Sequence, residues 1–340
     1  MQAEIPNIHG EGIPKIFGAS AANFVETALT VFRYQYQHTP VYRQFTDALH
    51  ISPVQVQKIE QIPFLPIQFF KTHIIAQDNI IPETVFESSG TTQSLNSKHY
   101  VQSLAIYRQS FLNAFEAFYG NIRDWCIIGL LPSYLERNNS SLVVMADELI
   151  KLSGHAESGF YLYDHEKLNA LLQDLGQRGQ KTLLIGVTFA LLDFAEKYSL
   201  RLKNTVVMET GGMKGRREEW TREQVHAFLS HRLGVSEIHS EYGMTELLSQ
   251  AYSRGNGVFF CPPWMKVLLR EEDDPMAVNN TKLKEGKNKT GIINVIDLAN
   301  IYSCSFIATD DVGRLHPNGG FEVLGRVDNS DIRGCSLMVL

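Results

Sequence analysis

The sequence predicts an α/β protein, in which a parallel sheet covered by helices is followed by a β-rich part. Three observations lead to this prediction. Short apolar segments alternate with helix-like segments between residues 83 and 250, which is typical of a parallel sheet buried on both faces. Residues 1–82 are mostly helical by periodicity, and residues 251–340 contain short strands separated by turn signals. We expect a single large domain, 1–340, with these three subregions.

The composition is that of an ordinary soluble globular protein. Of 340 residues, 44% are apolar and 20% charged, and the net charge is -6. Without a basic excess to neutralise phosphates, nucleic-acid binding is not expected. No apolar stretch approaches the roughly 20 residues that span a bilayer, and no signal peptide is visible. Four widely spaced cysteines, without a Cys-x-x-Cys pair, indicate free thiols in a reducing compartment. We therefore expect a cytoplasmic location.

The first helix is predicted from the spacing of Phe24, Ala28 and Val31, and Pro63 and Pro66 interrupt the helical pattern that follows. Residues 271–291 are polar and predicted to be an exposed loop. The other elements are predicted from the alternation of short apolar segments with helix-like segments, and then from short strands separated by turn signals. The predicted strands are residues 83–88, 125–131, 159–164, 181–187, 204–210, 236–243, 256–263, 265–271, 290–298, 305–313 and 320–328, and the predicted helices are residues 97–120, 140–154, 165–179, 189–199 and 217–234.

A hydroxyl-rich stretch, "SSGTTQSLNSK", lies at residues 88–98, between a predicted strand and a predicted helix. Backbone N–H groups and the helix dipole favour an anion in that position. Gly90 permits close backbone approach, and the neighbouring hydroxyls add donors for phosphate oxygens. A Ser/Thr-rich connection with N-cap residues is the alternative. The stretch does not match the P-loop pattern, because no Gly-Lys-Ser/Thr follows it.

Later motifs favour the phosphate-binding interpretation. A glycine pair in "ETGGMKGRR" follows the strand at residues 204–210, leaving bare backbone for a flat ring. The stretch "EYGMTELLSQ" places an aromatic ring, a glycine, a hydroxyl and a carboxylate at another strand end. Paired acids beside a turn glycine occur in "ATDDVGRL", and "LGRVDNSDIRGC" contributes a basic and an acidic residue.

In this order, the motifs resemble those of the adenylate-forming superfamily, which includes acyl-CoA synthetases and firefly luciferase. "SSGTT" looks like its phosphate loop, "YGMTE" like its most specific signature, and "TDDVGR" and "GRVD" like its two later motifs. The string "EYGMTELLSQAY", and an end soon after "GRVD", resemble the LuxE-like acyl-protein synthetases in particular. The resemblance covers roughly residues 60–340. It implies the adenylate-forming large-domain fold without the small C-terminal domain that carries a lysine in most members.

The resemblance also implies roles for particular residues. The β- and γ-phosphates of ATP would lie against the phosphate loop. Around the nucleotide, Tyr242 would stack on adenine, Asp311 would bond the ribose hydroxyls, Thr245 would bond the α-phosphate and Glu246 would hold Mg²⁺. The implied nucleotide-binding set is Ser88, Ser89, Gly90, Thr91, Thr92, Gly211, Gly212, Tyr242, Gly243, Thr245, Asp311 and Arg326.

Each residue also has a structural interpretation. Tyr242 alone would be a core or rim aromatic, Glu246 a carboxylate stabilised at a helix N-terminus, and Asp311 a turn former. The chain departs from the family at Gln93, where a glycine is usual, and the position of Lys98 is shifted, which leaves the role of that lysine open.

The terminal cysteine, Cys335, matches the acyl acceptor of the LuxE-like branch. The thiolate is the nucleophile, and Arg333 would lower the pKa of the thiol. A small buried apolar residue is the alternative for Cys335. The other cysteines, Cys126, Cys261 and Cys304, are interpreted as structural.

The resemblance implies an acid–thiol ligase that uses ATP and Mg²⁺ to convert a fatty or related carboxylic acid to acyl-AMP, and then transfers the acyl group to a protein thiol. An acyl reductase subunit or an acyl carrier protein would be the partner. Two alternatives stay open: a non-catalytic or transfer-only subunit of an acyl-modifying complex, and a ligase that passes acyl groups to a carrier-protein or CoA thiol.

Overall fold

The computed structural model describes residues 15–79, 81–89, 95–132, 139–211, 220–272, 274–279 and 288–327. Within these residues one thirteen-stranded sheet runs through the molecule, in the order β12-β11-β13-β14-β15-β10-β9-β8-β7-β6-β4-β5, with β1 paired to β14. At one end of this order, β5, β4, β6, β7 and β8 pair in parallel. The remaining neighbours, from β8 through β9 and β10 to β12 at the other end, pair antiparallel. The parallel and antiparallel parts of the sheet meet at β8, which is parallel to β7 and antiparallel to β9.

The parallel part matches the predicted alternation. Its strands are β4 (Cys126–Leu130), β5 (Gly159–Phe160), β6 (Thr182–Val187), β7 (Thr205–Thr210) and β8 (Ile238–Tyr242). The helices are α4 (Leu104–Tyr119), α5 (Ser141–Ser153), α6 (His165–Gln177), α7 (Thr188–Lys197) and α8 (Arg222–Leu233).

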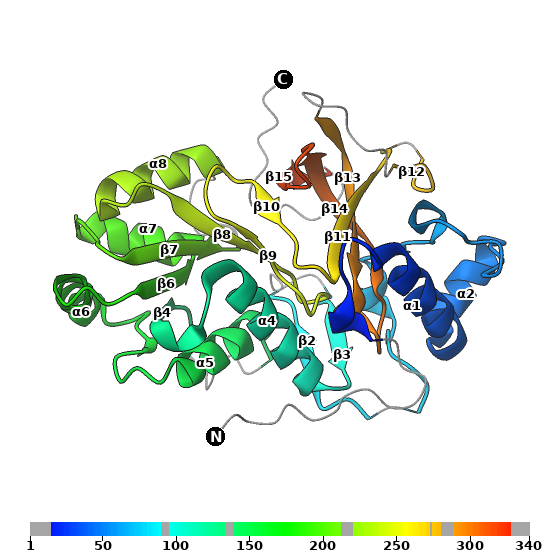
Figure 1. Ribbon diagram of the computed structural model, residues 1–340, viewed down its shortest axis with the longest axis horizontal. Helices are drawn as coiled ribbons and strands as arrows, with labels where there is room; N and C mark the ends of the chain where they lie inside the picture. The colour runs from blue at the N-terminus through cyan, green and yellow to red at the C-terminus, as the bar shows by residue number, and fades with distance from the viewer. Residues whose placement is uncertain are drawn as a thin grey trace.

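These strands are buried on both faces because consecutive side chains point to opposite sides of the sheet. Ile127, Leu183 and Ile185 belong to a core that includes apolar residues of α4 and α5. Ile128 and Leu184 instead pack with α6, α7 and α8. Figure 1 shows α4 and α5 on one side of the parallel strands, and α7 and α8 on the other. The continuous apolar runs in the sequence therefore reflect two cores.

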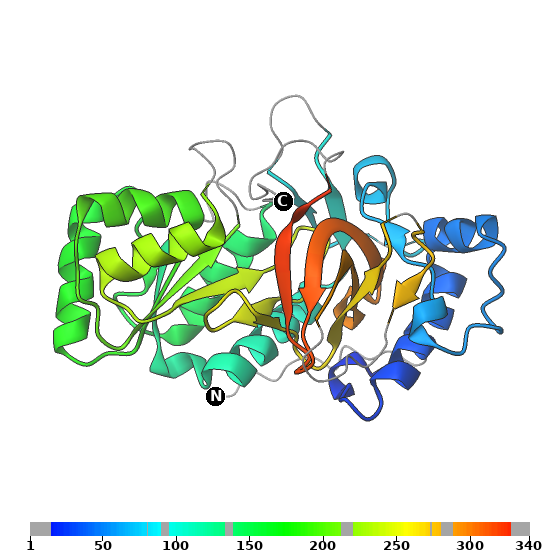
Figure 2. The same ribbon diagram turned by 90° about the horizontal axis from the view of Figure 1, so that it is seen from above.

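The antiparallel part follows β8 and confirms the predicted β-rich region. It consists of β9 (Ala251–Ser253), β10 (Phe259–Phe260), β11 (Met265–Arg270), β12 (Val278–Asn279), β13 (Lys289–Asp297), β14 (Phe306–Leu315) and β15 (Phe321–Arg326), with the 3-10 helix η4 (Leu298–Asn300) after β13. Figure 2 shows β14 and β15 between the parallel strands and the N-terminal helices. Although β10 and β9 lie between β15 and β8, the arrangement brings the late motif on β14 into side-chain contact with the end of β8.

The N-terminal part packs against these antiparallel strands. Its elements are η1 (Ile16–Gly18), α1 (Phe24–His38), α2 (Pro40–Ala48), η2 (Ile59–Gln61), β1 (Leu65–Pro66) and α3 (Phe69–Thr72). Ala28, Val31 and Phe32 of α1 are fully buried. The ring of Phe306 in β14 is contacted edge to face by Phe32, at 6.2 Å between centroids, and by Phe64, at 6.1 Å. Helical spacing in the sequence thus identified the face of α1 that covers the sheet.

The predicted helix at residues 97–120 is wrong in its first turns. Lys98–Val101 form β3, which pairs antiparallel with β2 (Thr84–Glu87), and α4 begins only at Leu104. His99 and Val101 are buried whereas Lys98 is exposed, a period of two that suits a strand. The hydroxyl-rich stretch therefore connects two strands of a hairpin. The expectation that it precedes a helix, and gains anion affinity from that helix's dipole, is overturned.

Three smaller boundaries also differ. The predicted strand at residues 159–164 is reduced to the two residues of β5. The helix predicted at residues 217–234 begins at Arg222, because the Thr221 hydroxyl accepts a hydrogen bond from the Gln224 N–H and caps its N-terminus; residues 217–219 lie outside the described part. The polar loop predicted at residues 271–291 contains β12, which pairs with β11.

Candidate functional site

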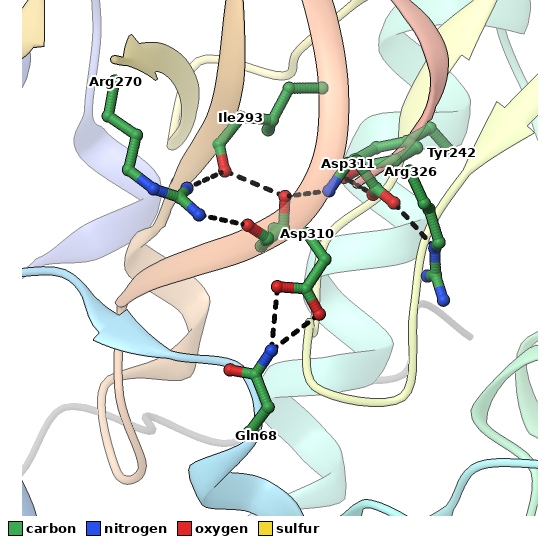
Figure 3. A network of polar contacts seen from close by, with 8 residues as sticks. Gln68, Tyr242, Arg270, Ile293, Asp310, Asp311 and Arg326 are labelled. Carbon is green, nitrogen blue, oxygen red and sulfur yellow. Dashed lines mark hydrogen bonds and ion pairs between the residues drawn. The ribbon is translucent and has the colours of Figure 1, made fainter. Parts of the chain in front are cut away.

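The carboxylate of Asp311 joins three strands at the centre of the candidate site (Figure 3). The Tyr242 hydroxyl, at the end of β8, donates to Asp311 Oδ2 at 2.9 Å. Arg326 of β15 donates from Nε to Asp311 Oδ1 at 3.0 Å. Burial, and secondly the charge of Asp311, raise the pKa of Tyr242 well above its usual range. The phenol therefore remains a donor, and residues from "YGMTE", "TDDVGR" and "GRVD" are in direct contact.

The paired acids expected from the sequence do not act as a pair. Asp310 and Asp311 both lie within β14, and Gly313 belongs to the same strand, next to a register shift, so it is no turn glycine. Adjacent strand residues point to opposite sides. Asp310 consequently faces Gln68, whose Nε2 donates to both carboxylate oxygens at 2.8 and 2.7 Å (Figure 3). Only Asp311 belongs to the cluster with Tyr242.

Glu246 lies four residues beyond Tyr242 and is 5% exposed. Burial raises the pKa of its carboxyl group, while the neighbouring Ser97 side chain and the charge of Arg326 oppose that shift. Asp311 acts on Glu246 in the same direction as burial. These electrostatic couplings place Glu246 beside the Asp311 cluster, and Ser97 brings the end of the hydroxyl-rich stretch to the same place.

The two ends of the hydroxyl-rich stretch are tied together. Ser97 N donates to Ser88 Oγ at 2.9 Å, and Ser88 N donates to Ser97 O at 3.0 Å. Ser89 follows Ser88 and is half-buried. The half-exposed Lys98 forms an ion pair with Glu87 across the hairpin, at 3.4 Å between Nζ and Oε1. The predicted phosphate-binding residues Gly90, Thr91 and Thr92 lie outside the described residues, as does Gln93.

The adenine-side position expected for Gly211 lies directly after β7. Gly211 has φ +69°, a conformation that favours glycine, and its carbonyl accepts a hydrogen bond from the Thr188 hydroxyl at 2.7 Å. Gly212 lies outside the described residues. The ends of β7 and β8 are neighbours, since Thr210 pairs with Glu241 in the parallel register. Gly211 follows β7 and Tyr242 ends β8, so both lie at the carboxyl edge of the parallel sheet, where ligands bind in open α/β sheets.

A buried acid, Glu241, sits beneath this edge and was not singled out from the sequence. It accepts a hydrogen bond from the Thr210 hydroxyl. Burial raises the pKa of Glu241 to about 7, opposed by the Thr210 bond and reinforced by Glu209. A Cβ at Gly243 would lie 2.3 Å from Glu241 Oε1, so the glycine of "YGMTE" leaves room for this carboxyl group. The sequence signal that could have identified Glu241 is its position directly before "YGMTE".

Three cysteines lie within the described residues, and one of them, Cys261, contributes electrostatically to the raised pKa of Tyr242. Cys126, Cys261 and Cys304 are free thiols. Burial raises the pKa of both Cys261 and Cys304 to about 12, so neither forms a thiolate at neutral pH. This agrees with their interpretation as structural residues. Cys335 lies outside the described residues, together with Arg333.

The donor set around Glu246 fits Mg²⁺. Mg²⁺ uses one or two carboxylates together with water and substrate phosphates, and Glu246 offers a buried carboxylate next to the Ser97 hydroxyl. Among the described residues no group of three or more His, Cys, Asp or Glu side chains forms a metal centre. The described part of the chain therefore holds no all-protein cage, and Glu246 is the carboxylate that would bind the ion.

Together, the parallel sheet and the antiparallel strands that continue it form the fold shared by adenylate-forming enzymes. Two solved structures share the fold: ATP-bound MatB from Rhodopseudomonas palustris and an ATP-bound RpMatB-BxBclM chimera. Each is 15% identical at a TM-score of 0.51, over 71% of this chain and 47% of the other. The present chain thus spans about half the length of these structures.

Sequence comparison identifies the family more closely. The model of LuxE, acyl-protein synthetase, matches residues 20–340, and the chain belongs to this family. A curated relative from Vibrio harveyi, a long-chain-fatty-acid–luciferin-component ligase, is 22% identical over 333 residues, covering 90% of this chain and 84% of its own. The protein is therefore an acyl-protein synthetase, a ligase. Among the described residues, no helix combines the length and hydrophobicity that a membrane crossing requires.

Proposed function

We propose that the protein activates a long-chain fatty acid with ATP and then transfers the acyl group to a protein thiol. The observation that carries this proposal is the contact of Tyr242 and Arg326 with Asp311, with Glu246 and Ser97 beside them. Four segments far apart in the sequence supply these groups. The Vibrio harveyi relative, whose name specifies a long-chain fatty acid, supports the choice of substrate.

In the first step, a carboxylate oxygen of the fatty acid bonds to the α-phosphorus of ATP. The bond from that phosphorus to the oxygen bridging to the β-phosphate breaks, and pyrophosphate leaves. In the second step, a thiolate sulfur attacks the acyl carbonyl carbon, and AMP leaves with the electron pair of the broken carbon–oxygen bond. The acyl-AMP intermediate replaces a poor electrophile with a good one, which is the purpose of splitting the reaction.

The nucleoside would be held at the edge formed by β7, β8 and β14. Asp311 retains acceptor capacity for ribose hydroxyls, because each carboxylate oxygen has two lone pairs and Tyr242 and Arg326 each use one. The Tyr242 ring and the bare backbone of Gly211 and Gly212 would bind the adenine, and Gly243 would permit close approach. Arg326 would orient Asp311 and add positive charge near the phosphates.

The triphosphate would extend from there toward the hairpin of β2 and β3. Thr245 would donate to the α-phosphate, whose oxygens gain charge as the carboxylate attacks. The β- and γ-phosphates would lie against Ser88, Ser89, Gly90, Thr91 and Thr92. Glu246 would hold Mg²⁺, which would neutralise charge on the phosphate oxygens.

For the acceptor, we propose Cys335, followed by transfer to a partner protein such as an acyl reductase subunit or an acyl carrier protein. Cys335 lies in the segment after "GRVD" and belongs to the matched length of the family model. The thiolate, and not the thiol, performs such an attack.

Acid-dependent exchange of labelled pyrophosphate into ATP tests the adenylation step. We expect exchange to be highest with long-chain acids in a panel from acetate to palmitate. Glu246→Gln should reduce it by roughly 100-fold, the size of effect that loss of one charge-stabilising group produces, while Glu166→Gln, an exposed glutamate of α6, should leave it unchanged. If no acid in the panel promotes exchange, the enzyme does not form acyl-AMP and the proposal fails.

A further inference from the structure

The loop of residues 243–250, here called the motif loop, is held by buried polar side chains from outside it. Asp297, at the end of β13, accepts hydrogen bonds from Leu248 N and Ser249 N, both at 2.9 Å. Asn300 Oδ1 also accepts from Leu248 N, at 3.0 Å. Both acceptors are fully buried. The second half of the motif loop is therefore fixed by η4 and the residue that precedes it.

The first half of the motif loop is fixed through two backbone carbonyls. The Thr245 carbonyl accepts from His99 Nδ1 at 3.0 Å, and the Glu246 carbonyl accepts from Asn300 Nδ2 at 2.7 Å. Thr245 and Glu246 are the residues proposed to meet the α-phosphate and Mg²⁺. Their backbones are thus held from two different segments, β3 and η4.

The contacts of His99 determine where its proton resides. A carbonyl oxygen only accepts hydrogen bonds, so the proton is on Nδ1. Nε2 then accepts from the Ser303 hydroxyl at 2.8 Å. His99 is 1% exposed, and burial lowers its pKa to about 4, with the Thr245 bond opposing that shift. Phe70 covers the ring edge to face at 5.7 Å. A neutral imidazole with both nitrogens used is held in one orientation.

His99 lies in β3, directly after the hydroxyl-rich stretch that is proposed to bind phosphate. Ser97 and His99 are two residues apart, and both are buried. Ser97 reaches the Glu246 carboxyl group and also closes the hydroxyl-rich stretch through Ser88. The segment that ends the proposed phosphate loop therefore contacts the motif loop twice, once at the Glu246 side chain and once at the Thr245 backbone.

We propose that His99 is a positioning residue for adenylation: its Nδ1–H bond to the Thr245 carbonyl sets the placement of the motif loop relative to the phosphate-binding hairpin. This inference rests on the proposed function. His99 touches no reacting atom and acts through Thr245 and Glu246. Displacement of catalytic groups by about 1 Å costs up to roughly 100-fold in rate, so the effect should fall on kcat.

Asn and Leu at position 99 provide a matched pair. The two side chains have the same branching, and the Asn Nδ2 occupies the place of the histidine Nδ1, whereas Leu offers no donor. In the full-length protein we expect His99→Asn to retain pyrophosphate exchange within about threefold of wild type. His99→Leu should lose roughly 10- to 100-fold in kcat, with little change in the KM for the fatty acid. Ser303→Ala, which removes the bond on the other nitrogen, should behave like His99→Asn.

Hydrogen–deuterium exchange gives a second measurement that does not depend on activity. Amides of the motif loop should exchange at least about fivefold faster in His99→Leu than in His99→Asn. If His99→Leu does not fold, His99→Gln serves as the variant without a donor to Thr245. The glutamine side chain is longer than asparagine, so its amide reaches toward Ser303 and leaves the Thr245 carbonyl without a donor.

Two results would overturn the inference: equal kcat in the Asn variant and the donor-less variant, or a loss in Ser303→Ala as large as that in His99→Leu. Absence of exchange in the wild-type enzyme refutes the proposed function instead. In that case the amide exchange rates still decide whether His99 holds the motif loop.

Discussion

Asp310 and Asp311 are consecutive residues of β14, yet their carboxylates are bound by different parts of the molecule. Asp310 accepts both of its side-chain bonds from Gln68 in the N-terminal part, and Asp311 accepts from Tyr242 and Arg326 at the candidate site. The strand therefore separates two acids that look equivalent in the sequence. One anchors β14, and the other faces the proposed nucleotide site.

This separation predicts unequal effects of the same substitution. We expect Asp311→Asn to reduce pyrophosphate exchange by roughly 10- to 100-fold, because hydrogen bonds to a charged group contribute more than neutral ones. Asp310→Asn should retain exchange within about threefold, since the Asp310 carboxylate is bound by Gln68 outside the site and its charge affects Arg326 less than that of Asp311 does. Exchange kinetics at varied ATP concentration would measure both, with thermal unfolding to verify the fold. Equal losses in the two variants would contradict the assignment of Asp311 to the site.

The acyl acceptor is tested separately from adenylation. We expect Cys335→Ser to abolish hydroxylamine-labile labelling of the protein by a radioactive fatty acid and to leave pyrophosphate exchange intact, because the thiol is needed only in the second step. Cys261→Ser is the matched control, since burial raises the pKa of Cys261 to about 12. Undiminished labelling of Cys335→Ser would remove this cysteine from the mechanism.

Glu241 predicts a pH dependence of stability. Burial raises its pKa in the folded protein to about 7 from the usual 4.5, so its contribution is fully present below pH 4.5 and is lost as the pH rises through 7. The groups that interact with it electrostatically are Glu209, Tyr107, Tyr119 and Tyr252. At about 1.36 kcal/mol per pKa unit, the loss amounts to about 3 kcal/mol by pH 8.

Glu241→Gln has no such titration. Its free energy of unfolding relative to wild type should therefore increase by up to about 3 kcal/mol between pH 4.5 and pH 8. Urea denaturation at both pH values would measure the change, and Glu116→Gln, at an exposed position of α4, serves as the control. A Glu241→Gln difference that is the same at both pH values would show that folding does not raise the pKa of the Glu241 carboxyl group.

The local pattern of apolar and polar residues was sufficient to predict most helices and strands of the fold. The apolar runs that became β4 and β6 are buried whichever way consecutive side chains point, so the unbroken apolar run and its short length identified them as strands. The helices between them were recognised from their apolar faces, and Gly154 ends α5 in the left-handed conformation that favours glycine. Strand β3 was missed because its four residues adjoin a strongly helical run, and only pairing with β2 makes the extended form stable.

The motifs determined the candidate site as a set of residues, because "YGMTE", "TDDVGR" and "GRVD" specify chemical groups whatever lies around them. Which groups meet was decided by tertiary structure: Tyr242 and Asp311 are 69 residues apart and touch only because β8, β9, β10, β15 and β14 form one continuous sheet. His99, Asp297 and Gln68 carry no local signal, since an isolated polar residue acquires a role only through its partner and its burial. The sequence by itself determined the family and most of the helices and strands. The folded sheet decided the contacts, because hydrogen bonds between distant segments depend on strand pairing that no local pattern encodes.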